Sequence, residues 1–497
     1  MSTRPARGSR LRYSGALGVW LTLAAVPAAA QVGPLTGQSL FFNQASFAHN
    51  GNFLAANAGM LYTSNAQYTA SGTADTILML GLGGNIGREG TRLDYHLDSD
   101  LALLKYLSGT YGTQLSGYLD GEAALKIVPG VFSWIARETY TQLQINPYAP
   151  TTPDNLANVN VITTGPRFTL RPTLRTSVKL EGLYSYVSSS SSSSEFVDID
   201  SHRYGGNLTV DRAFSSTSSL YAKGSYEKVD FRDQVDNNNF AVASAVAGYR
   251  LSGARTYLDI AGGYNRIQVE DIPTPVESIL GTVERPETQT FGGATWSLNL
   301  SRLITPSQRV ALFANQQFTD AAAASRLSFD QAVPTIAPVQ LAAGDPFQSR
   351  SFGADWRFQT LRTAIDISVV DFRIRYVVQT SNENDSDGKA ANVLFARQLS
   401  PVLSWDIGAS YSHSDYVKAS ATGLTSSTFT TALTDLRWRV GERLGLRFLY
   451  AYVKQYGAHA NQVGIVASYS LTGALPDVTQ LPNLLPTAPE SMQSPQQ

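Results

Sequence analysis

The chain has 497 residues and a nearly balanced charge, with 38 Lys+Arg against 39 Asp+Glu. No basic cluster is interleaved with aromatic side chains, so the usual electrostatic basis for binding nucleic acid is missing. The absence of cysteine excludes disulfides, thiolate metal sites and a lipidated N-terminal cysteine.

The first 30 residues have the pattern of an export signal. Arg4 and Arg7 lie in a basic start, residues 16–26 are apolar, and small residues lead up to Ala30 and Gln31. We predict a signal peptide over residues 1–30, cleaved near Ala30/Gln31, and a short periplasmic segment over residues 31–51. The apolar run is shorter than the ~20 residues of a spanning helix, which disfavours a membrane anchor.

Residues 52–472 alternate apolar and polar side chains in runs of about ten to fifteen residues, as antiparallel hairpins do. This alternating pattern is not interrupted by a segment with helical periodicity or by a linker rich in Pro and Ser, so one large domain is predicted. Short connections follow cationic residues at nine places: Arg88, Lys126, Arg171, Arg212, Arg250, Arg302, Arg357, Arg397 and Arg439.

The alternation fits either a soluble sandwich or a membrane barrel. In residues 403–411, Leu403, Trp405 and Ile407 share one face, and Ser404 and Asp406 share the other. The runs exceed the usual five or six residues of soluble strands, and Tyr and Trp gather toward their ends. We therefore predict an all-β fold: a single large antiparallel transmembrane β-barrel of about 20 strands, in a range of roughly 16 to 20, with short periplasmic turns and long extracellular loops.

The long connection from Asp320 to Phe347 differs from the others because it carries Ile336, Val339 and Leu341 among its prolines. One interpretation is a constriction loop that folds inward and narrows the lumen. The alternative is a packed external loop.

The remaining long connections, including residues 146–158 and 270–287, are polar and turn-prone, so we expect them outside the cell. Residues 473–497 are rich in proline and are predicted to form an extended or disordered periplasmic tail. A docking tether is the alternative for this tail.

The sequence shows no constellation for catalysis or metal binding. The five histidines lack metal-ligand spacing. Ser412 and His413 are neighbours on a predicted strand, so they point to opposite faces and cannot form a triad directly. Residues 383–388 match the opening of a calcium loop, but Leu394 stands where that loop needs a bidentate acid. We predict no catalytic site, no metal, no cofactor and no enzymatic activity.

Charged residues on the polar faces are predicted to line the lumen, since Arg or Lys at the lipid midplane costs roughly 2–4 kcal/mol. They form either a transverse field that orients a polar polymer or ordinary ion pairs that solvate the wall. The predicted basic arc consists of Arg373, Arg375, Arg437, Arg439 and Arg447. The predicted acidic arc consists of Asp94, Asp98, Asp100, Asp120 and Glu122.

One strand breaks the alternation. From Leu361 to Val369 the odd positions are mostly apolar, whereas from Phe372 to Tyr376 the even positions are. A β-bulge between Val369 and Asp371 is therefore predicted to keep the faces consistent.

Short motifs resemble those of a family of outer-membrane β-barrel porins encoded with exopolysaccharide operons and PEP-CTERM sorting systems. They include Gly121, Val128-Pro129-Gly130, Trp134, Thr152-Pro153-Asp154-Asn155, Thr164-Gly165-Pro166 and turns such as Arg212-Ala213-Phe214-Ser215. The resemblance implies a passive conduit or accessory porin for exopolysaccharide export, beside a periplasmic polysaccharide-export protein. It carries over no residue with a chemical role.

Three hypotheses follow: a polymer conduit, a general small-solute porin, and a structural or adhesive barrel of the outer membrane. The conduit predicts a wide polar lumen with Tyr118 facing the path, and the porin predicts a folded-in loop. Expected partners are outer-membrane lipid, lipopolysaccharide, the polymer and the export protein, with no nucleic acid.

Overall fold

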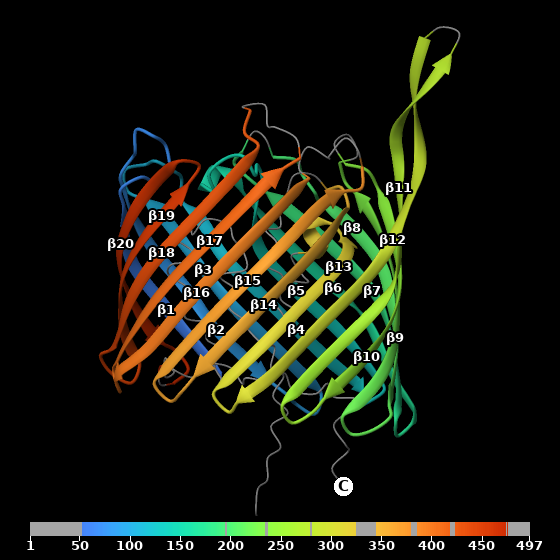
Figure 1. The fold of residues 1–497 in the computed structure, drawn as a ribbon, viewed down its shortest axis with the longest axis horizontal. Helices are drawn as coiled ribbons and strands as arrows, with labels where there is room; N and C mark the ends of the chain where they lie inside the picture. The colour runs from blue at the N-terminus through green and yellow to red at the C-terminus, as the bar shows by residue number, and fades with distance from the viewer. Residues whose placement is uncertain are drawn as a thin grey trace, which may run out of the picture.

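The computed structural model describes residues 52–193, 196–233, 237–278, 281–324, 344–378, 385–417, 423–473 and 475, which form one closed antiparallel sheet (Figure 1). The strands are β1 (Phe53–Thr63), β2 (Asp75–Arg88), β3 (Leu93–Tyr106), β4 (Gln114–Val128), β5 (Phe132–Gln144), β6 (Leu156–Thr173), β7 (Thr176–Ser190), β8 (Ser201–Ala213), β9 (Ser218–Phe231), β10 (Phe240–Ser252), β11 (Thr256–Ser278), β12 (Gly281–Thr305), β13 (Gln308–Thr319), β14 (Phe347–Gln359), β15 (Thr363–Tyr376), β16 (Ser386–Ser400), β17 (Leu403–Tyr416), β18 (Ser426–Arg439), β19 (Leu444–Gln455) and β20 (Ala458–Ser470).

The sheet closes on itself because β1 pairs with β20 as well as with β2. This pairing runs without interruption from Ala55 opposite Ser470 to Thr63 opposite Gln462. A closed sheet has no unpaired edge, so it satisfies the backbone in a bilayer. The predicted 20-stranded all-β barrel is confirmed.

Connections alternate in length around the barrel. One end of the barrel, the short-turn end, has nine short connections, which include residues 174–175, 306–307 and 401–402. All nine short connections lie where the sequence predicted them. Most connections at the opposite, long-loop end are longer, such as residues 145–155 and 320–346. By the usual architecture of bacterial barrels, the short turns face the periplasm.

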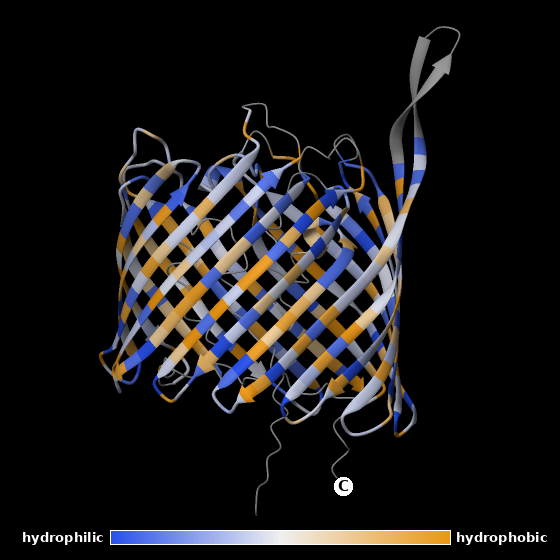
Figure 2. Cartoon of the chain, in the orientation of Figure 1, coloured by the Kyte–Doolittle hydropathy of each residue, from blue (hydrophilic) through white to orange (hydrophobic). Residues whose placement is uncertain are grey.

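The outward face is apolar around the middle of the barrel. On β2 the outward residues Leu78, Leu80 and Leu82 are 41%, 64% and 51% exposed, and Figure 2 shows the alternation of hydropathy along the strands. A contiguous apolar surface of this extent is a liability in water and is stable only where lipid covers it.

Aromatic residues border this apolar band. Trp134 and Trp405 lie on the outward face toward the short turns, and Tyr204 and Tyr264 lie toward the long loops. The indole of Trp134 donates a 2.8 Å hydrogen bond to Thr164 Oγ1, which satisfies it in apolar surroundings. Among the described residues, no helix combines the length and apolarity needed to cross a bilayer. The girdles and the apolar band identify an outer-membrane β-barrel.

The predicted bulge in β15 is wrong, and so is the lumen placement of Arg373 and Arg375. β15 pairs with β14 and β16 without any register shift, and its buried inward face runs through the even positions, including Phe372. Arg373 and Arg375 therefore point outward. The apolar positions change faces because the strand leaves the lipid: near the long loops its outward side is polar and its inward side packs against other residues.

The segment 270–287, expected to be a long external loop, is instead paired strand. β11 and β12 stay in register from Ile272 opposite Glu287 to Ser278 opposite Gly281, after a register shift between Val269 and Ile272. This hairpin projects beyond the rest of the barrel (Figure 1).

Several predicted segments lie outside the described residues. They are the signal peptide (residues 1–30), the periplasmic segment (residues 31–51), Ile336, Val339 and Leu341 of the constriction loop, and all of the C-terminal tail except residues 473 and 475.

Glycines on the inward face leave room for aromatic rings. Gly388 of β16 lies opposite Phe372 of β15, and a Cβ added there would lie 2.2 Å from the ring. The ring thus covers the glycine and shields the backbone of the neighbouring strand, an arrangement that fixes register.

We predict that Gly388→Val lowers the free energy of unfolding by about 1–3 kcal/mol, since the new side chain overpacks the site of Phe372. Urea titration in lipid vesicles measures this change. Gly262→Val is the matched control, because a Cβ at this strand glycine meets nothing within 4 Å. Equal stability of the two variants would contradict the packing argument.

Candidate functional site: the inner wall of the barrel

All five residues of the predicted acidic arc lie on the inward face of two neighbouring strands. Asp94, Asp98 and Asp100 belong to β3, and Asp120 and Glu122 belong to β4, with Asp98 directly opposite Asp120. Alternation along each strand brings them to the same face.

Several of these carboxylates have partners on the wall. Lys126 Nζ lies 2.7 Å from Asp94, and the hydroxyl of Tyr118 donates a 3.1 Å hydrogen bond to Asp98. Glu122 is bridged by Arg137 at 3.0 Å and by Arg167 at 3.3 Å. The arc is therefore partly neutralised by cations on its own and neighbouring strands.

The predicted basic arc is divided between the two faces of the wall. Arg437 and Arg447 face inward near the short turns and are almost fully buried. Arg439 ends β18 on the same face, where its guanidinium donates a 2.7 Å hydrogen bond to the carbonyl oxygen of Pro401. Arg373 and Arg375 lie on the outward face, as described above.

Asp435 is the hub of the inward part of this arc. Its Oδ2 accepts hydrogen bonds from Arg437 Nε at 2.9 Å and from Arg447 Nε at 2.6 Å. Arg437 also lies 2.7 Å from Asp406 of β17, so this group ties three neighbouring strands together.

Similar pairs recur around the short-turn half of the inner wall, and we call the whole set the ion-pair belt. Besides the groups above, it contains Arg167–Glu181, Arg250–Asp211, Arg250–Asp259, Arg309–Asp355 and Arg357–Asp366. Because each arginine of the belt except Arg439 is bonded to a carboxylate, the belt resembles ordinary wall pairing more than a transverse field.

Most belt residues were missing from the predicted arcs, although the sequence carries their signal. Asp355 and Arg357 alternate with Trp356 and Phe358, which face outward. The same alternation that predicted the outward faces could therefore have predicted these inward charges. Only their pairing partners depend on the strand register.

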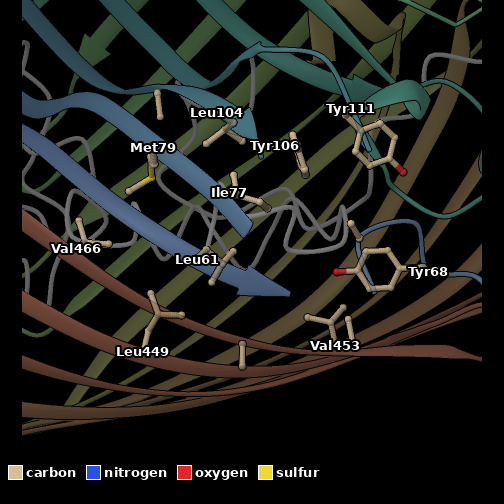
Figure 3. Close-up of a cluster of buried hydrophobic side chains, with 14 of the residues drawn as sticks. Leu61, Tyr68, Ile77, Met79, Leu104, Tyr106, Tyr111, Leu449, Val453 and Val466 are labelled. Atoms are coloured by element: carbon tan, nitrogen blue, oxygen red, sulfur yellow. The ribbon is translucent and has the colours of Figure 1, made fainter. Parts of the chain in front are cut away.

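Toward the long loops the inner wall becomes apolar. A first cluster gathers on β1, β2, β3, β18, β19 and β20 (Figure 3). It includes Leu61, Ile77, Leu104, Leu449 and Val453. A second cluster, on β5 to β7 and β9 to β11, includes Val161, Val187, Val229, Phe240 and Ile267.

The connection between β5 and β6, expected outside, reaches across the mouth to the strands beside the first cluster. The hydroxyl of Tyr416, on β17, donates a 2.9 Å hydrogen bond to Pro147 O, and its ring lies 4.5 Å from that of Tyr148. Thr151 N donates to Gln455 Oε1 at 3.3 Å. These contacts span most of the sequence, so no local pattern could have predicted them.

A single amide holds the shape of this connection. Asn155, at the end of the short 3₁₀ helix Pro153–Asn155, donates through Nδ2 to the carbonyl oxygens of Asn146, Ala149 and Pro150 at 2.8, 3.1 and 3.0 Å. Satisfying these carbonyls internally lets the loop pack away from water.

The connection after β13 also turns inward at its start. Arg203 of β8 donates hydrogen bonds to both carboxylate oxygens of Asp320, at 3.0 and 2.7 Å, and the two side chains are 1% and 5% exposed. Ala321 and Ala322, in the helical turn that follows, pack into the second cluster.

At the other end of this connection, Phe347 is buried on the inner wall with Ile374 and Tyr376. Asp320 and Phe347 thus both lie on the inward side. The central part of the predicted constriction loop, with Ile336, Val339 and Leu341, lies outside the described residues, so its path stays a prediction.

Two tyrosines in the connections at the mouth are buried. Burial raises the pKa of Tyr111 to about 12, and it also raises the pKa of Tyr68. Both phenols stay protonated at neutral pH and serve as hydrogen-bonding and packing groups, as in the 3.3 Å contact between Tyr68 and Gln462.

The described ranges hold no group of three or more His, Cys, Asp or Glu that could bind a metal ion. Ser412 faces inward and His413 faces outward, where His413 contacts Thr428 and Asp415. Nothing in this part of the wall assembles a nucleophile with a base.

Neither a protein-family model nor a curated protein matches the sequence. Solved structures with a similar chain path include the ferric citrate transporter FecA in its unliganded form, with 9% identity, a TM-score of 0.45, and coverage of 84% of this chain and 79% of that chain. The ferric-catecholate import receptor Fiu from K12 E. coli has 9% identity and a TM-score of 0.45, and the match covers 85% of this chain and 82% of that chain. The FrpB iron transporter from Neisseria meningitidis has 9% identity and a TM-score of 0.44, and the match covers 86% of this chain and 84% of that chain.

These similarities are too weak to carry an argument about function. The resemblance to porins of exopolysaccharide operons likewise finds no support in the comparisons, so it stays a prediction.

We predict that Asp435→Asn lowers the free energy of unfolding by about 3–5 kcal/mol, because two buried guanidinium groups lose their shared carboxylate. Adding Arg447→Met should recover part of this loss. Urea titration in vesicles measures both variants. Asp415→Asn, at an exposed carboxylate on the outward face of β17, serves as the control. A loss below about 1 kcal/mol for Asp435→Asn would contradict a stabilising role for the hub.

Proposed function

We propose that this barrel is a passive outer-membrane channel for polar solutes, with a mouth narrowed by inward-packed loops. The observation that carries the proposal is the buried Arg203–Asp320 pair, which fixes the start of the connection after β13 to the inner wall. A connection that starts on the inward side narrows the mouth at that point, and a folded-in loop is what the small-solute porin predicts among the three hypotheses.

The inner wall supports the same proposal. Paired charges of both signs give the short-turn half a hydrophilic surface with little excess of either sign. Such a wall solvates polar molecules without trapping ions of one sign. The connection at residues 145–155, bonded across the mouth to β17 and β19, adds a second restriction.

Export of exopolysaccharide is our second proposal, and the motif resemblance described above is its support. In that role the barrel is a passive conduit or accessory porin that receives polymer from a periplasmic export protein. The two proposals differ in the path that they need, because a polymer requires the inward loops to move aside.

Single-channel conductance in planar bilayers tests the first proposal. We predict that Arg203→Gln raises the conductance and the frequency of transitions between levels, since the loop loses its bidentate anchor. Arg212→Gln is the matched control, because it lies on the outward face of the same strand. If the wild-type protein forms no conducting channels, the proposed function is overturned. Unchanged traces for Arg203→Gln would overturn the role of the loop.

A deletion strain tests the second proposal. If the barrel conducts polymer, deletion should leave exopolysaccharide accumulated in the periplasm, and expression of the wild-type chain should restore secretion. Normal surface polymer in the deletion strain would exclude this role and leave the solute channel unaffected.

A further inference from the structure

Basic residues gather on the outward face of three neighbouring strands at the long-loop end. Arg350 of β14, Arg373 and Arg375 of β15 and Lys389 of β16 point away from the lumen within a few residues of the strand ends. We call these four residues the outer basic patch. Arg373 is 53% exposed at its side chain.

The patch has more positive than negative charge. Asp387 bridges Arg373 and Arg375 at 2.6 and 2.7 Å, and Asp385 lies 4.0 Å from Arg375. Asp371, also exposed on the outward face of β15, is the cross-strand partner of Lys389. Three carboxylates therefore stand against four cations. Within the described residues, Arg350 and Lys389 form no ion pair.

Two members of the patch face each other directly. Arg350 of β14 is the cross-strand partner of Arg373 of β15. Like charges at directly opposed positions of a sheet repel each other. An anion bound between them relieves this repulsion, and guanidinium groups match the oxygens of phosphate.

Immediately below the patch, the outward face of the same three strands is apolar apart from Asp371, which lies opposite Phe352. Toward the short turns, their outward positions carry Phe352 and Trp356 on β14, Ile367 and Val369 on β15, and Val393 and Phe395 on β16. The guanidinium carbon of Arg350 lies 4.6 Å from the centre of the Phe352 ring, at the boundary between the two zones. A cationic zone directly above an apolar zone suits a ligand with an anionic head and hydrocarbon tails.

We propose that the outer basic patch binds the phosphate groups of an outer-leaflet lipid whose acyl chains lie on the apolar zone below. Lipopolysaccharide has this chemistry, with phosphates at the level of the long-loop end and several chains beneath them. Basic clusters beside a membrane recognise anionic head groups in the same way. The proposal does not depend on what passes through the lumen.

The test is native mass spectrometry of the purified barrel in detergent. The probes are lipid A with both phosphates, lipid A without phosphates, and inorganic phosphate. The test variant is R350Q/R373Q/K389Q. The matched control is R212Q/R302Q/R397Q, which removes the same number of outward charges next to the short turns. Heat-modifiable mobility on gels checks that each variant is folded.

We expect the wild-type barrel to bind phosphorylated lipid A about tenfold more tightly than the dephosphorylated form, and excess inorganic phosphate should not displace it. The test variant should lose the preference, and the control should keep it. Equal binding of the two lipids by the wild-type barrel would overturn the proposal, even if the variants failed to fold. The proposal would also be overturned if inorganic phosphate displaced the lipid, or if the control variant lost the preference for phosphorylated lipid A as the test variant does. Binding of a second copy of the protein in place of lipid would overturn it as well.

Discussion

The structure depends on a wall that is one strand thick, so each strand has lipid on one side and the lumen on the other. Lipid requires apolar side chains outward only over the height of the hydrocarbon layer. Above that height the requirement ends, and on β15 the two faces exchange character without any change of register. Ile367 and Arg373 lie on the same outward face, and Arg373 is the one nearer the long loops.

The inner wall follows the complementary rule. Within the hydrocarbon layer no water reaches the outward face, so charges needed for a polar lumen point inward and are matched by carboxylates across the strands. The ion-pair belt does this in the short-turn half. Near the long loops the inward face is apolar because connections fold over it, as Ala322 does in the second cluster and Tyr68 in the first. The polar and apolar zones of the inner wall thus differ in what covers them.

The sequence predicted what depends on local periodicity. It predicted the outward faces through Leu403, Trp405 and Ile407, the nine short turns, and the inward placement of Asp94 and Arg437. It failed where the environment changes along a strand: the apolar residues Phe372 and Tyr376 were assigned to lipid, which required a bulge that does not exist. Contacts such as Tyr416 with Pro147 or Arg203 with Asp320 join residues distant in sequence, so only the closed fold brings them together.

The exchange of faces along β15 can be measured directly, since the chain has no cysteine and single-cysteine spin labels are easily introduced. Labels at positions 367, 369, 372, 373 and 374 would be tested in vesicles for collisions with oxygen and with a water-soluble relaxer. We expect oxygen access at 367 and 369, access to the water-soluble reagent at 373, and little access to either at 372 and 374. Strong oxygen access at 372 and 374, as a bulge would produce, would contradict the exchange of faces.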